Sequence, residues 1–190
     1  ISTSVITMIF WSFGFLRMGT VGLVSQAFGK SDYREIVLIT LRNFCLAIIF
    51  SLIIMFCKNP ILDLVQNYFN TDPETQSFIK KYITVRILST PAELIIYVLI
   101  GFYLGLQKTF ISSLITTFFS LANIFLSIYF VRELNLDILG VALGTVVSAY
   151  LTISIFIVYS YFFVLKNFKV LPRYQRIFLP KKLLKLFNIN

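Results

Sequence analysis

Few residues of this 190-residue chain could do chemistry, and most of them lie inside long apolar segments. Thr116, Ser120, Asn123 and Ser127 follow one another at spacings of four, three and four residues. These spacings place the four side chains on one face of a helix. Such a face can bond to neighbouring helices or line a cavity. We expect a water-accessible cavity lined by Ser120, Asn123 and Ser127, and Thr145 of the fifth apolar segment could turn toward it.

Two charged residues, Arg17 and Glu93, lie near the middle of apolar segments. A charged side chain at the centre of a bilayer costs at least about 2.5 kcal/mol unless it is paired or faces water. We expect the two segments to run in the same direction with both charges at similar depth. The sequence therefore predicts an ion pair between Arg17 and Glu93, direct or through water. A proton-carrying role for Glu93 remains open beside this structural role.

Several kinds of catalytic site are excluded or disfavoured. The chain has no His, and its two cysteines, Cys45 and Cys57, lie in one apolar run. A His-containing triad is impossible, and a His/Cys metal site or a disulfide framework is disfavoured. The run Gly29-Lys30-Ser31 resembles the end of a phosphate-binding loop, but Val24 stands where that loop needs Gly. We expect a protein without enzymatic activity, without a metal site and without a cofactor.

The composition indicates a membrane protein with several helices. Hydrophobic residues make up 58% of the chain, and the mean hydropathy is +0.87. The net charge of +9 could suggest nucleic acid. However, the basic residues lie in short loops and in the tail, so membrane lipids are the expected partner and nucleic acid is not. We predict an all-α transmembrane fold whose spans cover residues 1–28, 36–57, 78–106, 110–131 and 138–165.

Loop charges and small residues predict how these spans are oriented and packed. The loops with more Lys and Arg should be cytoplasmic, which places the N-terminal end outside and makes residues 166–190 a basic cytoplasmic linker. Glycines at helical spacing predict closely packed helix faces. They are Gly19 and Gly22 in the first span, and Gly140 and Gly144 in the fifth. Five spans and a first residue other than Met lead us to expect a missing upstream helix.

Four stretches resemble one transporter family. FWSFGFLRMGTVGLVSQAFGKSD resembles the second helix, and RILSTPAELIIYVLIGFYLGLQKT the fourth helix, of multidrug and toxic compound extrusion (MATE) transporters. LANIFLSIYFV and LGVALGTVVSAY resemble the fifth and sixth helices. The similarity is to the branch named DNA-damage-inducible protein F. It implies twelve helices in two lobes, of which this chain is a five-helix portion, helices two to six, of the six-helix N-terminal lobe.

The resemblance also implies a function. Such transporters sit in the inner membrane and export organic, often cationic, compounds in exchange for H⁺ or Na⁺, by alternating access around a central cavity. The missing helices of the complete chain would be its partners. Two alternatives remain, a flippase for lipid-linked precursors and a non-transporting scaffold subunit.

The resemblance further implies where the coupling ion binds. In this branch the N-lobe site uses an Asp on the first helix and an Asn-x-x-x-Asp pair on the fifth. Asn123 matches the Asn, Ser127 stands at the Asp position, and Thr145 matches a polar residue of the sixth helix. Because Ser carries no proton near neutral pH, coupling would rest on the first-helix Asp, on Glu93, or on an altered mechanism.

Overall fold

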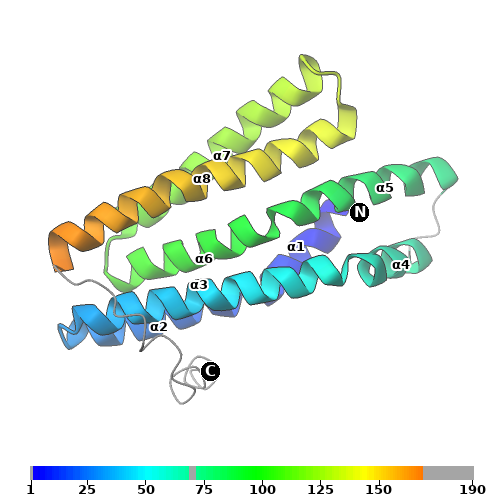
Figure 1. Ribbon diagram of the computed structural model, residues 1–190. Coiled ribbons are helices and arrows are strands. Elements are labelled where there is room, and N and C mark those ends of the chain that lie inside the picture. Colours follow the sequence, from blue (N-terminus) through cyan, green and yellow to red (C-terminus); the bar gives the residue numbers. More distant parts are fainter. Residues whose placement is uncertain (1, 69–71, 169–190) are drawn as a thin grey trace.

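The computed structural model describes residues 2–68 and 72–168, and nearly all of these are helical (Figure 1). The elements of this part of the chain, in order, are α1 (Ser2–Ser12), α2 (Gly14–Gly29), α3 (Tyr33–Phe56), α4 (Lys58–Tyr68), α5 (Pro73–Arg86), the 3-10 turn η1 (Ile87–Ser89), α6 (Thr90–Gly105), α7 (Thr109–Arg132) and α8 (Asp137–Phe168).

Five helical stretches in the described residues are long and apolar enough to cross a membrane. They are Ile6–Gly29, Tyr33–Phe56, Pro73–Gly105, Thr109–Arg132 and Asp137–Phe168. The predicted all-α transmembrane fold is therefore confirmed. The last helix continues to Phe168, so residues 166–168 of the expected linker are helical. The rest of that linker lies outside the described residues.

Side chains at the helix ends explain where two of the helices begin. The Asp32 carboxylate accepts a hydrogen bond from the Glu35 main-chain N–H at 3.0 Å, so α3 begins at Tyr33. The Asp72 carboxylate accepts a hydrogen bond from the Thr75 main-chain N–H at 3.0 Å, so α5 begins at Pro73. Each carboxylate satisfies a main-chain donor that has no partner within the helix.

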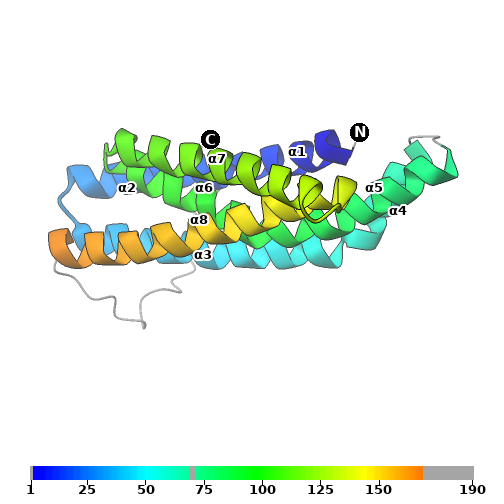
Figure 2. The same ribbon diagram turned by 90° about the horizontal axis from the view of Figure 1, so that it is seen from above.

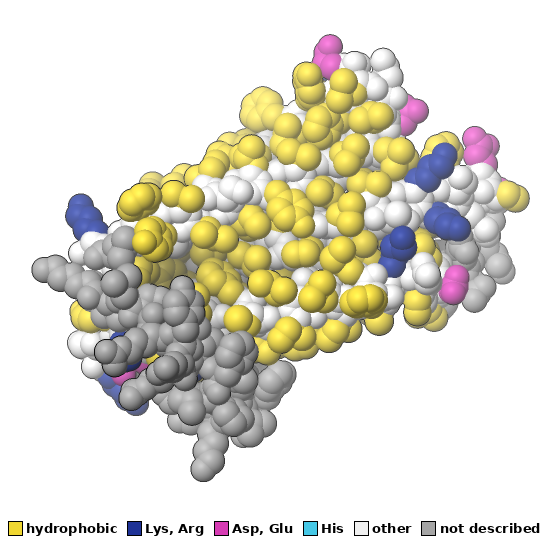
Figure 3. Space-filling model, in the orientation of Figure 1, with side chains coloured by type: hydrophobic (Ala, Val, Ile, Leu, Met, Phe, Trp, Pro, Cys, Tyr) yellow, Lys and Arg dark blue, Asp and Glu magenta, His cyan; other side chains and the backbone are white. Residues whose placement is uncertain are grey.

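Helix α6 lies at the centre of the bundle, between the α2–α3 pair and the α7–α8 hairpin (Figures 1 and 2). Its side chains include several of the most deeply buried in the described residues, such as Leu94, Leu99, Phe102 and Tyr103. Apolar side chains cover the long face of the molecule in Figure 3, and charged ones gather toward its two ends. This is the surface expected of a bundle that spans a bilayer.

Close contact between helices depends on glycines of α6 that the sequence argument did not name. A Cβ atom on Gly101 would lie 2.7 Å from the Thr20 Cβ, and one on Gly105 would lie 2.6 Å from the Val24 Cβ. On the facing helix α2, Gly19 is buried and Gly22 is half-buried. Helices α2 and α6 therefore approach each other along a seam that leaves no room for a methyl group on α6.

The α7–α8 hairpin is packed in a similar way. A Cβ atom on Gly140 would lie 3.0 Å from the Phe130 carbonyl carbon, and one on Gly144 would lie 2.7 Å from the Ser127 main-chain nitrogen. The Gly140 and Gly144 face of α8 thus lies directly against α7. This contact brings the polar residues of the two helices together.

Candidate functional site

The polar residues that the sequence singled out on α7 and α8 meet at Asn123 and Thr145. The Asn123 side-chain amide donates to the Thr145 hydroxyl at 2.8 Å. That hydroxyl donates in turn to the Val141 carbonyl, one turn earlier on α8, at 3.1 Å. Thr145 is buried and Asn123 is half-buried. The pair leaves the Asn123 side-chain carbonyl oxygen available to a ligand.

Ser127 lies one turn further along α7 and faces Gly144. Its hydroxyl oxygen is buried and has no hydrogen-bond partner among the described residues. A buried polar group without a partner costs about 1–3 kcal/mol, so such a hydroxyl is suited to an ion or a water molecule. A Cβ at position 144 would overlap the Ser127 side chain. Gly144 therefore makes room for this hydroxyl as well as allowing the two helices to pack closely.

The other two residues on this polar face of α7, Thr116 and Ser120, are not part of the cluster of Asn123, Ser127 and Thr145. Thr116 is exposed, and its hydroxyl donates to carbonyls of its own helix, those of Ser112 and Ser113, at 3.2 and 2.9 Å. Ser120 is also exposed. Helix α7 buries few of its side chains in the described bundle, so Ser120 lies on an open surface, apart from the Asn123–Thr145 pair.

Glu93 has a different partner from the one expected. It forms an ion pair with Arg86, and the Ser89 hydroxyl donates to the same carboxylate oxygen at 2.7 Å. The predicted direct pair with Arg17 is therefore wrong. Arg86 lies on the same face of the same span, so its long side chain reaches Glu93 without any contribution from another helix. The Arg86 guanidinium also lies over the Phe10 ring, 5.3 Å from its centre.

The backbone beside this ion pair is broken at η1, where Pro91 removes a helical hydrogen-bond donor. Three hydroxyl groups satisfy the carbonyls of the broken turn. Ser89 donates to the Arg86 carbonyl at 2.7 Å, and Thr90 donates to the Ile87 carbonyl at 2.6 Å. The third donor comes from another helix: the Tyr150 hydroxyl of α8 donates to the Leu88 carbonyl at 3.0 Å. Each of these three carbonyls therefore has a hydroxyl donor.

Arg17 is exposed and forms no ion pair within residues 2–68 and 72–168. Its main chain lies against α6, because a Cβ on Gly101 would lie 2.8 Å from the Arg17 carbonyl oxygen. Tyr97, one turn before Gly101 on α6, is half-buried. Of Arg17, Arg86 and Glu93, only the last two form an ion pair in the described part of the chain.

Helix α3 carries polar residues that the sequence argument missed. Arg42 and Asn43 are both buried. Arg42 pairs with Glu35 at 3.1 Å, and the Asn43 amide donates to the Thr20 hydroxyl of α2 at 2.7 Å. The sequence could have identified Arg42 and Asn43, because both are polar residues inside an apolar segment.

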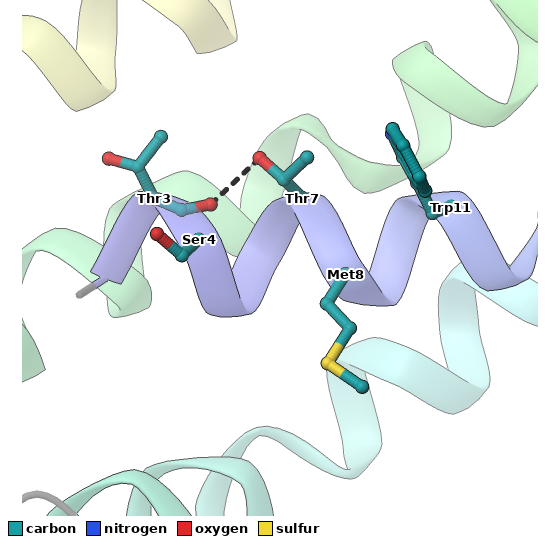
Figure 4. Close-up of a pocket in the computed structure, with 5 residues that line it drawn as sticks. All are labelled: Thr3, Ser4, Thr7, Met8 and Trp11. Carbon is teal, nitrogen blue, oxygen red and sulfur yellow. Dashed lines mark hydrogen bonds between the residues drawn. The ribbon is translucent and has the colours of Figure 1, made fainter.

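An open hollow of about 410 Å³ lies along α1 and is lined by Thr3, Ser4, Thr7, Met8 and Trp11 (Figure 4). The Thr7 hydroxyl donates to the Thr3 carbonyl at 2.8 Å. Met8 and Trp11 expose more than three quarters of their surface. No group of three His, Cys, Asp or Glu side chains that could hold a metal ion is present in the described part of the chain.

Comparison with known proteins identifies the family. The family model described as MatE matches residues 1–129, which is more than half of the chain. This chain belongs to the MatE family. Among curated proteins, it is 30% identical over 141 residues to the DNA damage-inducible protein F of Escherichia coli K12. It is 27% identical over 136 residues to the multidrug export protein MepA of Staphylococcus haemolyticus.

These matches cover 74% and 72% of this chain, but only 31% and 30% of the two relatives. The chain thus spans about a third of the length of the curated relatives that it matches.

Solved structures of transporters of the MOP superfamily share the fold. An outward-facing multidrug resistance transporter of the MATE family superposes with a TM-score of 0.81 at 20% identity, over 97% of this chain and 42% of that one. A transporter from Pyrococcus furiosus, whose description notes a binding pocket of reverse polarity, superposes with a TM-score of 0.83 at 19% identity, over 99% and 42%. At these identities the likeness concerns the fold alone.

Proposed function

We propose that this chain is part of a secondary active efflux transporter of the inner membrane. In the complete protein, small organic compounds would leave the cell in exchange for H⁺ or Na⁺, by alternating access around a central cavity. The MatE match supports this class of function, and so does the name of the second relative, a multidrug export protein.

The observation that carries the proposal is the polar cluster of Asn123, Ser127 and Thr145. Two hydrogen-bonded side chains, and a buried hydroxyl that has no partner among the described residues, lie where α7 packs directly against α8. All three present neutral oxygen atoms, which hard cations prefer as ligands. These residues can contribute ligands to Na⁺, whereas none of them holds a proton near neutral pH.

Proton coupling would therefore need a carboxylate. Glu93 is the one carboxylate that this chain places deep within a span, and it is already paired with Arg86. A proton on Glu93 would break that pair, and Arg86 would then lose its counter-charge in a nearly buried position. H⁺ coupling through this chain alone is thus less well supported than Na⁺ coupling at Asn123, Ser127 and Thr145.

Transport by the complete protein in proteoliposomes tests the proposal. Efflux of fluorescent organic probes would be driven by an imposed Na⁺ gradient or an imposed pH gradient. Asn123→Ala and Thr145→Val should each lower gradient-driven efflux by about tenfold, the change expected when about 1.4 kcal/mol of ligand binding is lost. Thr116→Val is the matched control, because that hydroxyl bonds only to its own helix. Unchanged efflux in both site variants would refute the proposal.

Thiol labelling separates a transporter from a membrane scaffold. Cysteines introduced singly at 123 and 127 in a cysteine-free background should react with water-soluble thiol reagents during transport. Protection of both positions in every condition would favour the scaffold, because a scaffold needs no water at this depth.

A further inference from the structure

We propose that α1 is a hinged half of the first span, which bends at Phe13 and is held against the broken third span by a contact between Phe10 and Arg86. The opening of this contact during alternating access rests on the proposed transport function, whereas the hinge itself can be measured without transport. Three observations carry the proposal: a break in the first span, different packing on the two sides of it, and a contact that links α1 to the third span.

The first span is broken at Phe13. Residues Ile6–Gly29 form one apolar stretch that is long enough to cross a membrane, yet they belong to two helices, α1 and α2. At the break, main-chain hydrogen bonds reach back three residues instead of four. The Phe13 N–H donates to the Phe10 carbonyl and the Leu16 N–H donates to the Phe13 carbonyl, each at 3.0 Å. Because 3-10 bonds within a helical span often mark a hinge, the first span is built to bend here.

The residues on either side of Phe13 explain the break without a proline. The Ser12 hydroxyl donates to the Met8 carbonyl at 3.1 Å, a kind of bond that often bends helices. Gly14, on the other side, has no side chain to restrict its main chain, so a helix continues through it less readily than through alanine. Glycine and serine close together are a known cause of helix kinks. The local sequence therefore weakens the helix at this point.

The two sides of the break pack differently. Helix α2 is tied to α6 along the close seam of Gly101 and Gly105. On α1, Ile6 and Phe10 are buried in an apolar cluster that Leu16 of the first turn of α2 also joins. The members of this cluster from α5 and η1 are Ile79, Tyr82, Ile83 and Ile87. In Figure 1, α1 turns away from the line of α2 toward the junction of α5 and α6. The seam thus fixes α2, whereas α1 takes its position from the third span.

Arg86 connects the end of α1 to the break in the third span. Its guanidinium lies 5.3 Å from the centre of the Phe10 ring, which is close enough for a cation–π attraction. Arg86 is the last residue of α5, and its ion pair with Glu93 of α6 holds the guanidinium in place. A weaker contact, from the Thr3 hydroxyl to the Tyr82 hydroxyl at 3.5 Å, joins the same two helices. The contact of Phe10 with Arg86 is therefore the latch of α1.

The latch can open without disturbing the helices beside it. Arg86 keeps Glu93 as its partner when the Phe10 ring moves away, so no buried charge loses its counter-charge. The α2–α6 seam lies on the far side of the break, and its close contacts stay as they are. A segment joined through a weak main-chain turn can move while closely packed neighbours stay in place. The structure shows the latched state, and the released state is the one that a transport cycle would populate.

Distances between spin labels in the complete protein test the hinge. In a background without Cys45 and Cys57, nitroxide labels would be attached to Met8→Cys on α1 and Ile49→Cys on α3. The reference pair would be Met18→Cys on α2 and Ile49→Cys, and all three side chains are exposed in the described bundle. In proteoliposomes frozen with and without an ion gradient and substrate, double electron–electron resonance should show two distances for the first pair and one for the reference. A single distance for the first pair in every condition would overturn the proposal.

Two substitutions locate the latch and the hinge. Phe10→Leu keeps an apolar side chain but removes the ring face, so the released fraction should rise by roughly three- to tenfold. Phe110→Leu, which changes an exposed ring on α7, is its control. Gly14→Ala restricts the joint, so the first pair should then show one distance. Gly29→Ala, at the far end of α2, should keep both distances, and an added Cβ at either glycine meets no atom within 4 Å.

The outcomes separate the hinge from the proposed function. Unchanged distances in both Phe10→Leu and Gly14→Ala would overturn the hinge, and if Phe10→Leu does not fold by size-exclusion chromatography, Gly14→Ala alone decides. Ion-driven efflux of an organic probe with a single α1 distance throughout would refute the hinge and leave the transporter intact. Two distances without ion-driven efflux of any probe would refute the transport function and leave the hinge.

Discussion

Replacing Gly101 with Ala should measurably destabilise the bundle at the α2–α6 seam. The new methyl carbon would lie 2.7 Å from the Thr20 Cβ and 2.8 Å from the Arg17 carbonyl oxygen, where ordinary contacts begin at 3.4 Å. The neighbours would have to give by roughly 0.7 Å, and one of them is main chain that no side-chain rotation can move. Overpacking of this kind costs about 1–3 kcal/mol.

Part of that cost is offset, because Ala stabilises a helix by about 1 kcal/mol relative to Gly. The net loss should be about 0–2 kcal/mol relative to the wild type, and about 1–3 kcal/mol relative to a Gly→Ala change that meets no neighbour, with a matching fall in Tm. Thermal unfolding of the complete protein in detergent, followed by size-exclusion chromatography, measures it.

Gly29→Ala is the matched control for this substitution, since nothing lies within 4 Å of its added carbon. Its Tm should equal or slightly exceed that of the wild type. If Gly101→Ala were as stable as this control, the close approach of α2 and α6 would be wrong.

Three further predictions follow from other contacts. Thr20→Val removes the hydrogen bond to the buried Asn43 amide and should cost about 1–3 kcal/mol, measured by thermal unfolding. Glu93→Gln and Arg86→Gln should each destabilise the protein more than the double variant does, because each single change leaves one charge nearly buried and unpaired. If the losses in stability of the two single variants simply add in the double variant, the ion pair is refuted. Hydrogen bonds from the first turn of α5 hold the pKa of Asp72 below its usual value of 3.8. The amides of that turn should therefore lose their protection from hydrogen exchange as the pH falls below about 4, and Asp72→Ala should lose it at neutral pH. Protection that persists in both cases would contradict the role of Asp72 as a helix cap.

The sequence predicted the spans well because length and hydropathy are local properties. It could not assign the partner of Glu93, since periodicity states which residues share a helix face but not which neighbour they reach. Arg86 was on that face, and a partner seven residues away on one span needs no tertiary contact. The seam glycines were missed for a different reason. Gly101 and Gly105 have the same small-xxx-small spacing as Gly140 and Gly144, but the sequence prediction placed packing faces only in the first and fifth spans.

The site on α7 and α8 shows the same limit. The spacing of the α7 stripe put Ser120, Asn123 and Ser127 on one face, and the resemblance added Thr145. Only three-dimensional packing shows that Asn123 bonds to Thr145 while Ser120 stays on the open surface. It also shows that Gly144 leaves space for the Ser127 hydroxyl, which no pattern within a single helix could reveal.

Ion movement that accompanies substrate efflux tests the central proposal most directly. With the complete protein in proteoliposomes, internal Na⁺ and pH would be recorded while an organic substrate is expelled, for the wild type and for Thr145→Val. We predict that efflux by the wild type drives entry of one of these ions, and that Thr145→Val loses most of this coupled flux. Efflux without any ion movement, or full coupling in Thr145→Val, would contradict the proposed role of Asn123, Ser127 and Thr145.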